Sequence, residues 1–400
     1  MGSGTLDRLP LEGVRIVDLS TVVMGPLATR MLADMGADVI WVESPDGDVL
    51  REYRPMRSPK MSAFSMNVSR NKRSIVLDLK SDAGRVALHE LIATADVFVT
   101  NIRRKAVERL GFAEPAVRAI RPDIIYCVAN GFGSDGPNAD HAVYDDVIQA
   151  ASGLASIFAW NGGEPQLVPS IMADKVAGVH IAFAIAAALH GRAKSGEGAS
   201  IEVPMAETMA AFNLVEHLGG QTFRPQLGDF SYNRIRTSHR RPRRTADGWI
   251  VILPYSKDNW HHFFDFAGRP ALKEDPRFAT GGDRVANADA LYGLLDDIVK
   301  QKETDIWLEF CKLNSIPASD VVDLEQLGDD PHFAAVGLYQ DDEHPTEGPY
   351  RYVRDPIRMN GQSSPIRHHA PRLGADTEEV LRELGWDDER IATLRPADTT

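Results

Sequence analysis

The stretch VRIVDLSTVVMGPLATRMLADMGADVIWV, residues 14–42, contains the pattern that decides the fold. A β-rich run at 14–19 is followed by a turn, a helical pattern at 27–35 and a second β-rich run at 38–42. Gly36 stands where the helix is expected to end, a position that favours glycine. The order strand, helix, strand predicts a βαβ unit with two parallel strands.

Further β-rich runs alternate with helical patterns along the next hundred residues. Runs at 74–79, 96–101 and 123–130 are expected strands, and a helix is expected at 82–95. Strands that alternate with helices are typical of a parallel, doubly wound sheet. The sequence therefore predicts an α/β fold with a Rossmann-like large domain.

The length of the chain predicts a second, smaller domain, because 400 residues exceed what one hydrophobic core usually organises. Residues 1–220 are expected to form the first part of the large domain, and residues 326–400 a return linker and its C-terminal part. Between them, an arginine-rich linker at 221–247 leads to an α+β domain at 248–325. The segment at 329–370 is expected to return in extended form across the surface.

Composition and charge argue against several classes of protein. Hydrophobic residues at 43% and charged residues at 25% are ordinary for a globular protein. A net charge of −13 disfavours binding to nucleic acid or to an anionic membrane surface. Cys127 and Cys311 match no zinc or redox spacing, and no uninterrupted apolar run is long enough to span a membrane. We therefore expect a cytoplasmic protein that needs no metal.

A dinucleotide cofactor is one alternative for a Rossmann-like sheet. The first turn offers only Gly25, whereas the dinucleotide fingerprint needs three spaced glycines for the pyrophosphate to approach the backbone. Glu43, at the end of the second expected strand, would be the ribose-binding acid of that alternative. We interpret it instead as an ordinary strand-end carboxylate, and no redox cofactor is expected.

A second informative segment embeds ionisable residues in otherwise apolar sequence. It reads VYDDVIQAASGL at 143–154 and VPSIMADKVAGVHIAFAIAAAL at 168–189. The run at 176–189 is expected to be a helix buried on nearly all sides, with Asp174 just before it. A carboxylate at a helix N-terminus stays ionised even when it is partly buried. Asp174 is then either a helix cap or a nucleophile or base.

Three basic segments stand out in this acidic chain. SRNKRS at 69–74 and TNIRRKAVERLGF at 100–112 are expected near the carboxyl ends of strands, where they either bind an anionic ligand or form a solvated surface. The segment at 234–244 contains six arginines and no acid. It either binds nucleic acid, holds an acidic small molecule or pairs with a partner subunit.

An ordered set of motifs resembles the family III CoA-transferases over residues 10–386. The motifs are LEGVRIVDLSTVVMGP, LADMGADVIWVESPDGD, NKRSIVLDLK, DVFVTNIRRKAVERLGF, VYDDVIQAASGL, MADKVAGVHIAFAIAAALHGRAKSGEGASIEVPM and HRRPRRTADGWI. The family includes the carnitine-type, bile-acid-induced and formyl-CoA transferases, and 2-methylacyl-CoA racemases share its fold. The resemblance implies an enzyme that moves CoA from an acyl-CoA to a free carboxylic acid.

The resemblance also implies roles for individual residues. Asp174 would attack the thioester and form an acyl-aspartyl anhydride and then an aspartyl-CoA thioester. Val23 would lie near the thiol, and Tyr144 and Asp145 in the substrate pocket. The enzyme would be an interlocked homodimer with no cofactor beyond CoA itself. The residues implied to contact CoA are Val22, Asn71, Lys72, Arg73, Leu77, Lys80, Asn101, Ile102 and Arg109.

Departures from the family pattern bear on the reaction and on the substrate. The racemases carry a histidine where this chain has Tyr144, so proton transfer lacks a second base unless His141 supplies it. An acyl-CoA isomerase and a non-catalytic CoA-binding protein therefore remain as alternatives. The formyl-CoA transferases carry a glutamine in place of Val23 and a glycine run in place of the arginines. Our hypothesis is that Arg240 and Arg241 bind a larger acid, such as the dicarboxylate succinate.

Overall fold

The computed structural model describes residues 8–161, 163–232 and 235–394, and the chain divides into two compact units. The larger unit comprises the residues up to Ser152, Leu167–Ala211 and the residues from Ala335 on. The smaller unit comprises Gly153–Gln166 and Phe212–Ala334.

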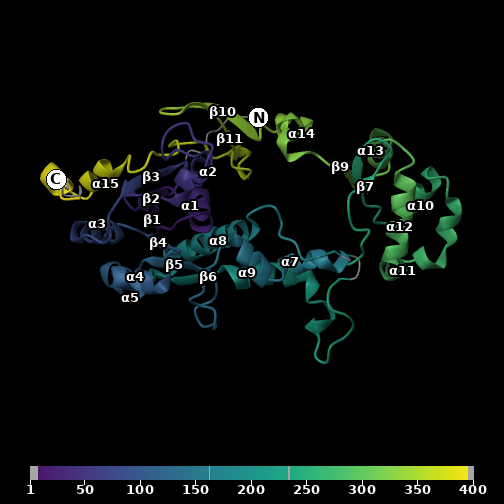
Figure 1. Ribbon diagram of the computed structural model, residues 1–400, viewed down its shortest axis with the longest axis horizontal. Helices are drawn as coiled ribbons and strands as arrows, with labels where there is room; N and C mark the ends of the chain where they lie inside the picture. Colours follow the sequence, from purple (N-terminus) through teal and green to yellow (C-terminus); the bar gives the residue numbers. More distant parts are fainter. Residues whose placement is uncertain (1–7, 162, 233–234, 395–400) are drawn as a thin grey trace. The chain divides into compact units, whose positions relative to one another are not determined.

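A six-stranded parallel sheet forms the centre of the larger unit (Figure 1). The strand order is β3-β2-β1-β4-β5-β6, so the order reverses between β1 and β4. This arrangement confirms the predicted doubly wound α/β fold. The strands are β1 (Arg15–Leu19), β2 (Asp38–Glu43), β3 (Lys72–Val76), β4 (Val97–Thr100), β5 (Ile125–Asn130) and β6 (Ser200–Pro204).

Helices cover both faces of this sheet. Val17 and Leu19 of β1 point into a core shared with α3 (Asp82–Ala93), α5 (Glu114–Ile120) and α15 (Thr377–Glu383). Asp18, which alternates with them, accepts a hydrogen bond from Thr29 of α1 on the opposite face. The other helices of this unit are α1 (Met24–Asp34), η1 (Val49–Glu52), α2 (Ala63–Ser69), α4 (Arg104–Leu110), α6 (Asp145–Ala151), α8 (Met172–Ser195) and α16 (Asp388–Ala392).

Helix α8 differs from its prediction in start, length and burial. It begins at Met172, so Asp174 lies in its first turn and not before it. The side chains of Val179 and Phe183 are 50% and 72% exposed, so the prediction of burial on nearly all sides is wrong for the single chain. By length and composition α8 is also the one helix among the described residues that is long and apolar enough to cross a membrane. Its buried side packs against α1, α6, β5 and β6.

The C-terminal return contains more regular structure than an extended segment. It forms two hairpins, β10 (Tyr339–His344) with β11 (Gly348–Val353), and β12 (Arg358–Met359) with β13 (Gln362–Ser363). The backbone of these strands is extended, and the structure adds the antiparallel pairing that the prediction did not include.

The smaller unit has its own hydrophobic core and an antiparallel three-stranded sheet in the order β7-β8-β9. Trp260, Phe263 and Trp307 are buried in this core. Its strands are β7 (Arg243–Arg244), β8 (Trp249–Ile252) and β9 (Ala318–Asp320). Its helices are α7 (Leu154–Ile157), η2 (Phe158–Asn161), η3 (Gly219–Thr222), α10 (Lys257–Phe266), η5 (Pro270–Glu274), η6 (Pro276–Phe278), α11 (Gly281–Ala286), α12 (Ala288–Val299), α13 (Thr304–Leu313) and η7 (Leu324–Asp329); α9 (Met205–His217) and α14 (Pro331–Ala335) cross the division between the units.

Candidate active site

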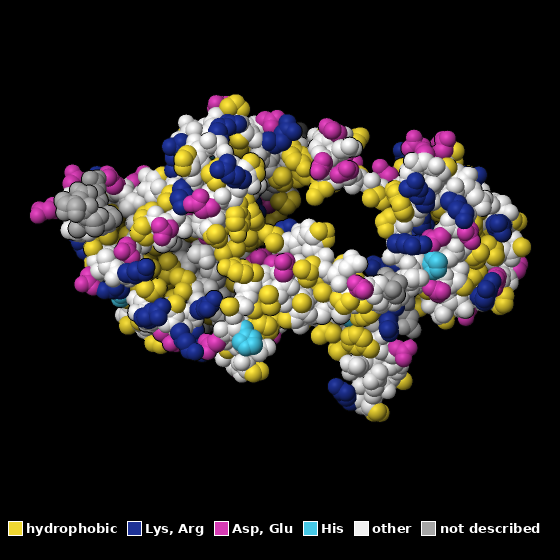
Figure 2. Space-filling model, viewed as in Figure 1, with side chains coloured by type: hydrophobic (Ala, Val, Ile, Leu, Met, Phe, Trp, Pro, Cys, Tyr) yellow, Lys and Arg dark blue, Asp and Glu magenta, His cyan; other side chains and the backbone are white. Residues whose placement is uncertain are grey.

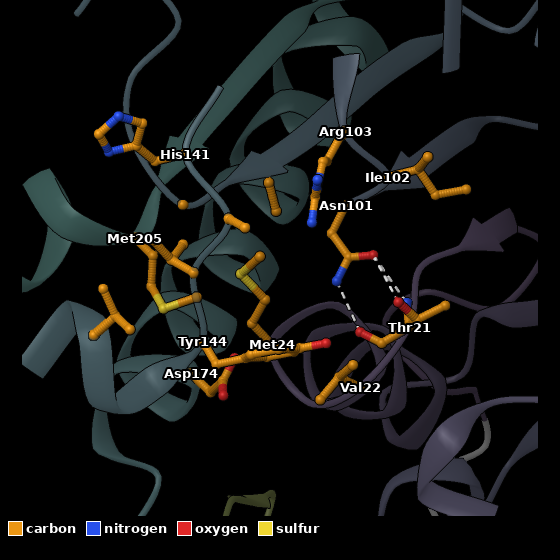
Figure 3. Close-up of a pocket in the computed structure, with 15 residues that line it drawn as sticks. Thr21, Val22, Met24, Asn101, Ile102, Arg103, His141, Tyr144, Asp174 and Met205 are labelled. Carbon is orange, nitrogen blue, oxygen red and sulfur yellow. Dashed lines mark hydrogen bonds between the residues drawn. The ribbon is translucent and has the colours of Figure 1, made fainter. Parts of the chain in front are cut away.

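A cavity of about 350 Å³ opens at the carboxyl ends of β1, β4 and β5 (Figure 3). Its wall is formed by the turn after β1, the residues after β4, the end of β5 and the first turns of α6 and α8. Ligands of doubly wound sheets bind outside the carboxyl ends of the strands, where the strand order reverses. This cavity lies wholly within the larger unit and is the candidate active site.

Asp174 is the acidic residue on the wall of this cavity. Asp174 is 7% exposed, and its backbone N–H donates to Asp145 Oδ2 at 3.0 Å. Burial raises the pKa of Asp174 to about 6, the charge of Asp145 adds to the rise, and a hydrogen bond from the Met24 backbone N–H opposes it. The carboxylate is therefore mostly ionised at neutral pH, although little water surrounds it.

Tyr144 and Asp145 have different positions, although both were predicted in the substrate pocket. Tyr144 lines the cavity and is exposed. Asp145 is buried, is not among the lining residues, and accepts a hydrogen bond at Oδ1 from Gln149 Nε2 at 2.5 Å. Gln149 was missed by the sequence analysis. A polar residue one helical turn after Asp145 in an apolar segment was the signal that could have indicated it.

The turn after β1 holds Val22 in the left-handed region, with φ of 66°. This conformation is strained for a β-branched residue, and Asp48 Oδ2 stabilises it by accepting the Val22 N–H at 2.8 Å. Asn101 holds the same turn by accepting from the Thr21 N–H at 2.9 Å and donating to Thr21 O at 2.7 Å (Figure 3). Val22 and Asn101 line the cavity, whereas Val23 is buried in a small apolar cluster.

Leu77 and Lys80 line a second cavity of about 310 Å³ at the carboxyl ends of β2 and β3. Thr21 and Ile102 line both cavities, so the two are adjacent along the same edge of the sheet. Arg109 is exposed on α4 and lines neither of them.

Asn71, Lys72 and Arg73 lie at the other edge, because β3 begins at Lys72. The expectation that SRNKRS lies at the carboxyl end of a strand is therefore wrong. Lys72 Nζ donates to Asp18 Oδ2 at 3.0 Å, and Arg73 Nε donates to Asp38 Oδ1 at 3.0 Å. Asn71 Oδ1 accepts the backbone N–H groups of Arg367 and His368. The structure does not bring these three side chains to either cavity.

Arg240 and Arg241 belong to the smaller unit, where they line a separate cavity of about 270 Å³. Arg241 Nη2 donates to Asp296 Oδ2 at 3.2 Å, while Arg240 is exposed. Arg234, the first arginine of this segment, lies outside the described residues.

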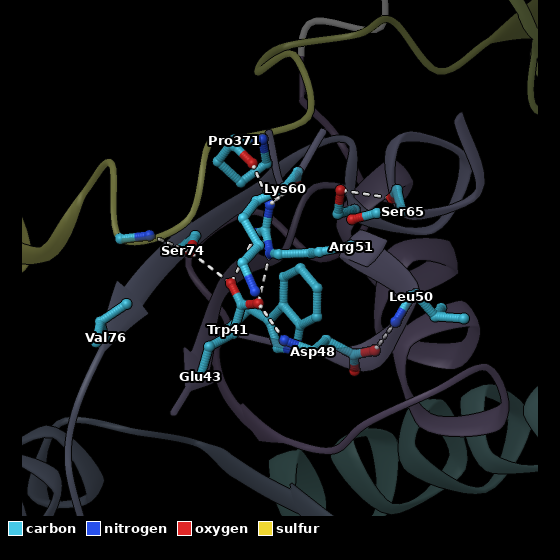
Figure 4. A network of polar contacts seen from close by, with 12 residues as sticks. Trp41, Glu43, Asp48, Leu50, Arg51, Lys60, Ser65, Ser74, Val76 and Pro371 are labelled. Atoms are coloured by element: carbon cyan, nitrogen blue, oxygen red, sulfur yellow. Dashed lines mark hydrogen bonds and ion pairs between the residues drawn. The ribbon is translucent and has the colours of Figure 1, made fainter. Parts of the chain in front are cut away.

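Glu43 forms a buried ion pair with Arg51, in which Arg51 Nε and Nη2 donate to its two carboxylate oxygens at 2.6 and 2.7 Å (Figure 4). It is thus engaged within the protein, as its interpretation as a strand-end carboxylate requires. Within 8–161, 163–232 and 235–394, no group of three or more His, Cys, Asp or Glu residues is placed to hold a metal ion.

Comparison with known proteins places the chain in one family. The sequence model of CoA-transferase family III matches residues 11–377. The succinate–glutarate CoA-transferase of Agrobacterium fabrum is 33% identical over 96% of this chain and 98% of its own length. The human succinyl-CoA:glutarate CoA-transferase is 30% identical over 97% of this chain and 89% of its own length. The formyl-CoA:oxalate CoA-transferase of Afipia carboxidovorans is 30% identical over 96% of each chain.

Solved structures agree with the sequence comparison. A mutant of Rv3272 from Mycobacterium tuberculosis superposes with a TM-score of 0.81 at 27% identity, covering 94% of this chain and 99% of the other. A CaiB/BaiF family protein from Brucella suis superposes with a TM-score of 0.78 at 29% identity, and the match covers 94% of this chain and 100% of the other. The chain therefore belongs to CoA-transferase family III.

Proposed function

We propose that the enzyme moves CoA from an acyl-CoA thioester to a free carboxylic acid, with Asp174 as the nucleophile. The observation that carries this proposal is the buried carboxylate of Asp174, with a pKa of about 6, on the wall of the cavity where the strand order reverses. A carboxylate is a weak nucleophile, and removing water from it and raising its pKa both increase its reactivity. At neutral pH it still carries the charge that the attack requires.

The reaction proceeds by exchange of acyl bonds at Asp174. A carboxylate oxygen attacks the thioester carbonyl carbon, and the CoA thiolate leaves, which gives a mixed anhydride. The thiolate then attacks the aspartyl carbonyl, which releases the first acid and gives an aspartyl-CoA thioester. The acceptor carboxylate attacks this thioester, and the released thiolate takes the acceptor acyl group from the second anhydride. No ATP or redox cofactor is needed, because each step exchanges one activated acyl bond for another.

We propose that part of CoA lies along the second cavity. Leu77 contributes apolar surface, and the ammonium of Lys80 is a cation suited to phosphate. Thr21 and Ile102, which line both cavities, mark the path of the pantetheine arm toward Asp174. Lys80→Ala is expected to weaken CoA binding measured by calorimetry, and unaltered binding would contradict this placement.

Transfer of labelled CoA between an acyl-CoA and free acids tests the proposed function. The rate is expected to be low at acidic pH and to rise through about 6 to a plateau, because the Asp174 carboxyl is protonated and unreactive below its pKa. His141 lines the same cavity, on the far side from Asp174 in Figure 3, and keeps an acyl-CoA isomerase as a second candidate. Deuterium entering the 2-carbon of a 2-methylacyl-CoA, without transfer of label, would support the isomerase instead. CoA binding with neither reaction would indicate a non-catalytic binder.

We further propose a dicarboxylic acceptor held by Arg240 and Arg241, supported by the relatives named for succinate and glutarate. Replacing both arginines by Ala is expected to raise KM for the acceptor at least about tenfold, since even one charge-assisted hydrogen bond contributes roughly 1.5–3 kcal/mol. KM for the acyl-CoA should not change. Arg244→Ala, which removes a guanidinium lying over the Trp249 ring, is the control. An unchanged KM for the acceptor rules out this role.

We also propose that the enzyme forms an interlocked homodimer and that it works in the cytoplasm. Exposed apolar side chains on α8 and α9, among them Phe183 and Val215, support it, because monomers rarely leave such surface in water. On the face seen in Figure 2, hydrophobic side chains gather over the middle of the larger unit, where Figure 1 shows α1 and α8. Sedimentation at the 44.0 kDa of one chain would contradict the dimer.

A further inference from the structure

Gln149 is a buried amide on α6 that contacts Asp145 and the segment leading into α8. We propose that Gln149 is a positioning residue for the reaction, which acts on Asp174 through Asp145. The proposal rests on the proposed role of Asp174 as nucleophile, and it adds a residue to which the sequence analysis assigned no role.

The side-chain amide of Gln149 is fully buried, and each of its polar atoms has a partner. Its Nε2 donates to Asp145 Oδ1 at 2.5 Å and to Ser170 O at 3.0 Å. Its Oε1 accepts the Val168 N–H at 2.9 Å. The amide therefore ties α6 to residues 168–170, which lead directly into α8.

Asp145 divides its two carboxylate oxygens between Gln149 and Asp174. Oδ1 accepts from Gln149 Nε2, and Oδ2 accepts the backbone N–H of Asp174 at 3.0 Å. The N-cap residue of α8, Ile171, gives no side-chain hydrogen bond, so Asp145 satisfies one of the unpaired N–H groups of this helix. The Asp145 carboxylate thus caps the first turn of α8.

The same contact sets the electrostatic surroundings of the nucleophile. Asp145 is the neighbouring charge that raises the pKa of Asp174, after burial itself. Gln149 donates a hydrogen bond to the carboxylate that carries this charge, so it fixes the position of the charge beside Asp174. The other charged or titratable side chains nearby are Asp146 on α6, Lys175, whose Nζ donates to Ser170 Oγ, and Arg103 and His141 on the cavity wall. Among the described residues, Gln149 is the side chain that donates to the Asp145 carboxylate.

Gln149→Glu tests the proposal, because it keeps the length of the side chain and the acceptor for the Val168 N–H. It replaces the two N–H donors with a carboxyl group that has at most one donor and that repels the Asp145 carboxylate when ionised. We expect kcat to fall about 10- to 100-fold, the usual effect of losing a residue that orients a reacting group. KM for the acyl-CoA should stay within about twofold, because Gln149 touches neither cavity. Gln340→Glu on β10 is the matched control, since it removes the hydrogen bond that Gln340 Nε2 donates to Gly337 O and should leave kcat unchanged.

A double-mutant cycle shows whether Gln149 acts through Asp145. Asp145→Asn removes the neighbouring charge, so the acidic limb of the rate profile should move to lower pH. In the Asp145→Asn background, Gln149→Glu should lower kcat by a much smaller factor than it does in the wild type. The proposal would be overturned if the two substitutions lowered kcat by independent factors that multiply in the double variant. An unchanged kcat in Gln149→Glu would also overturn it. If Gln149→Glu does not fold, Gln149→Asn, with its shorter amide, replaces it in the cycle. Covalent marking of Asp174 in the wild type tests the nucleophile separately.

Discussion

Asp174→Asn is expected to lower CoA transfer by about three orders of magnitude or more, because a side-chain amide forms no anhydride with the acyl group. The substitution keeps the size of the side chain, and the backbone N–H of residue 174 still donates to Asp145. Binding of CoA, measured by calorimetry, should change little, since the second cavity does not contain Asp174. The loss should therefore appear in kcat and not in the dissociation constant.

Asp146→Asn is the matched control for this variant. Asp146 lies on α6 next to Asp145, but its side chain is exposed, so the same chemical change should leave transfer within about twofold. Transfer by Asp174→Asn within tenfold of the wild type would remove Asp174 from the chemistry. Equal losses in both variants would point to general damage to this region.

Arg51→Met is expected to have the largest effect on stability, lowering the free energy of unfolding by about 3–5 kcal/mol. Arg51 is fully buried and donates to both carboxylate oxygens of Glu43 and to Pro371 O, the last at 3.1 Å (Figure 4). Its guanidinium carbon also lies 4.8 Å from the centre of the Trp41 ring. Methionine fills part of the volume but leaves the Glu43 carboxylate buried without its cation. Urea unfolding followed by circular dichroism measures the change.

Arg382→Met provides the control for the loss of a cation. Arg382 is half exposed and pairs with Glu378 and Asp388, and such pairs contribute only about 0–1 kcal/mol. Adding Glu43→Leu to Arg51→Met should recover part of the stability, because it removes the unpaired charge. Similar losses for Arg51→Met and Arg382→Met would show that the buried pair has no special role.

The sheet was predictable because its signals are local. The strands β1 to β5 and the helices α1 and α3 follow periods that nearby residues set, and the structure confirms their order. The basic segment at 69–74 was misplaced because its partners are distant in sequence. Asp18 and Asp38, which bind Lys72 and Arg73, lie on two other strands. Charge alone does not distinguish a cluster paired inside the protein from one that faces a ligand.

The start of α8 was missed for a similar reason. Ile171 is a poor cap, so local preference favoured a helix that begins after Asp174, with Asp174 as its cap. The structure begins the helix at Met172, with the Asp145 carboxylate, 29 residues earlier, binding an N–H of its first turn. The exposed apolar face of α8 was also unpredictable, since composition reports how apolar a helix is and not how many of its sides are covered.

The measurement that tests the central proposal most directly is a peptide-mass map after incubation with a panel of acyl-CoAs and quenching with hydroxylamine. Hydroxylamine converts an activated aspartyl group to a hydroxamate, which adds about 15 Da. We predict this mark on Asp174 in the wild type and its absence from Asp146, and the acyl-CoA giving the strongest mark identifies the donor. CoA binding with an unmarked Asp174 across the panel would contradict covalent transfer through this residue.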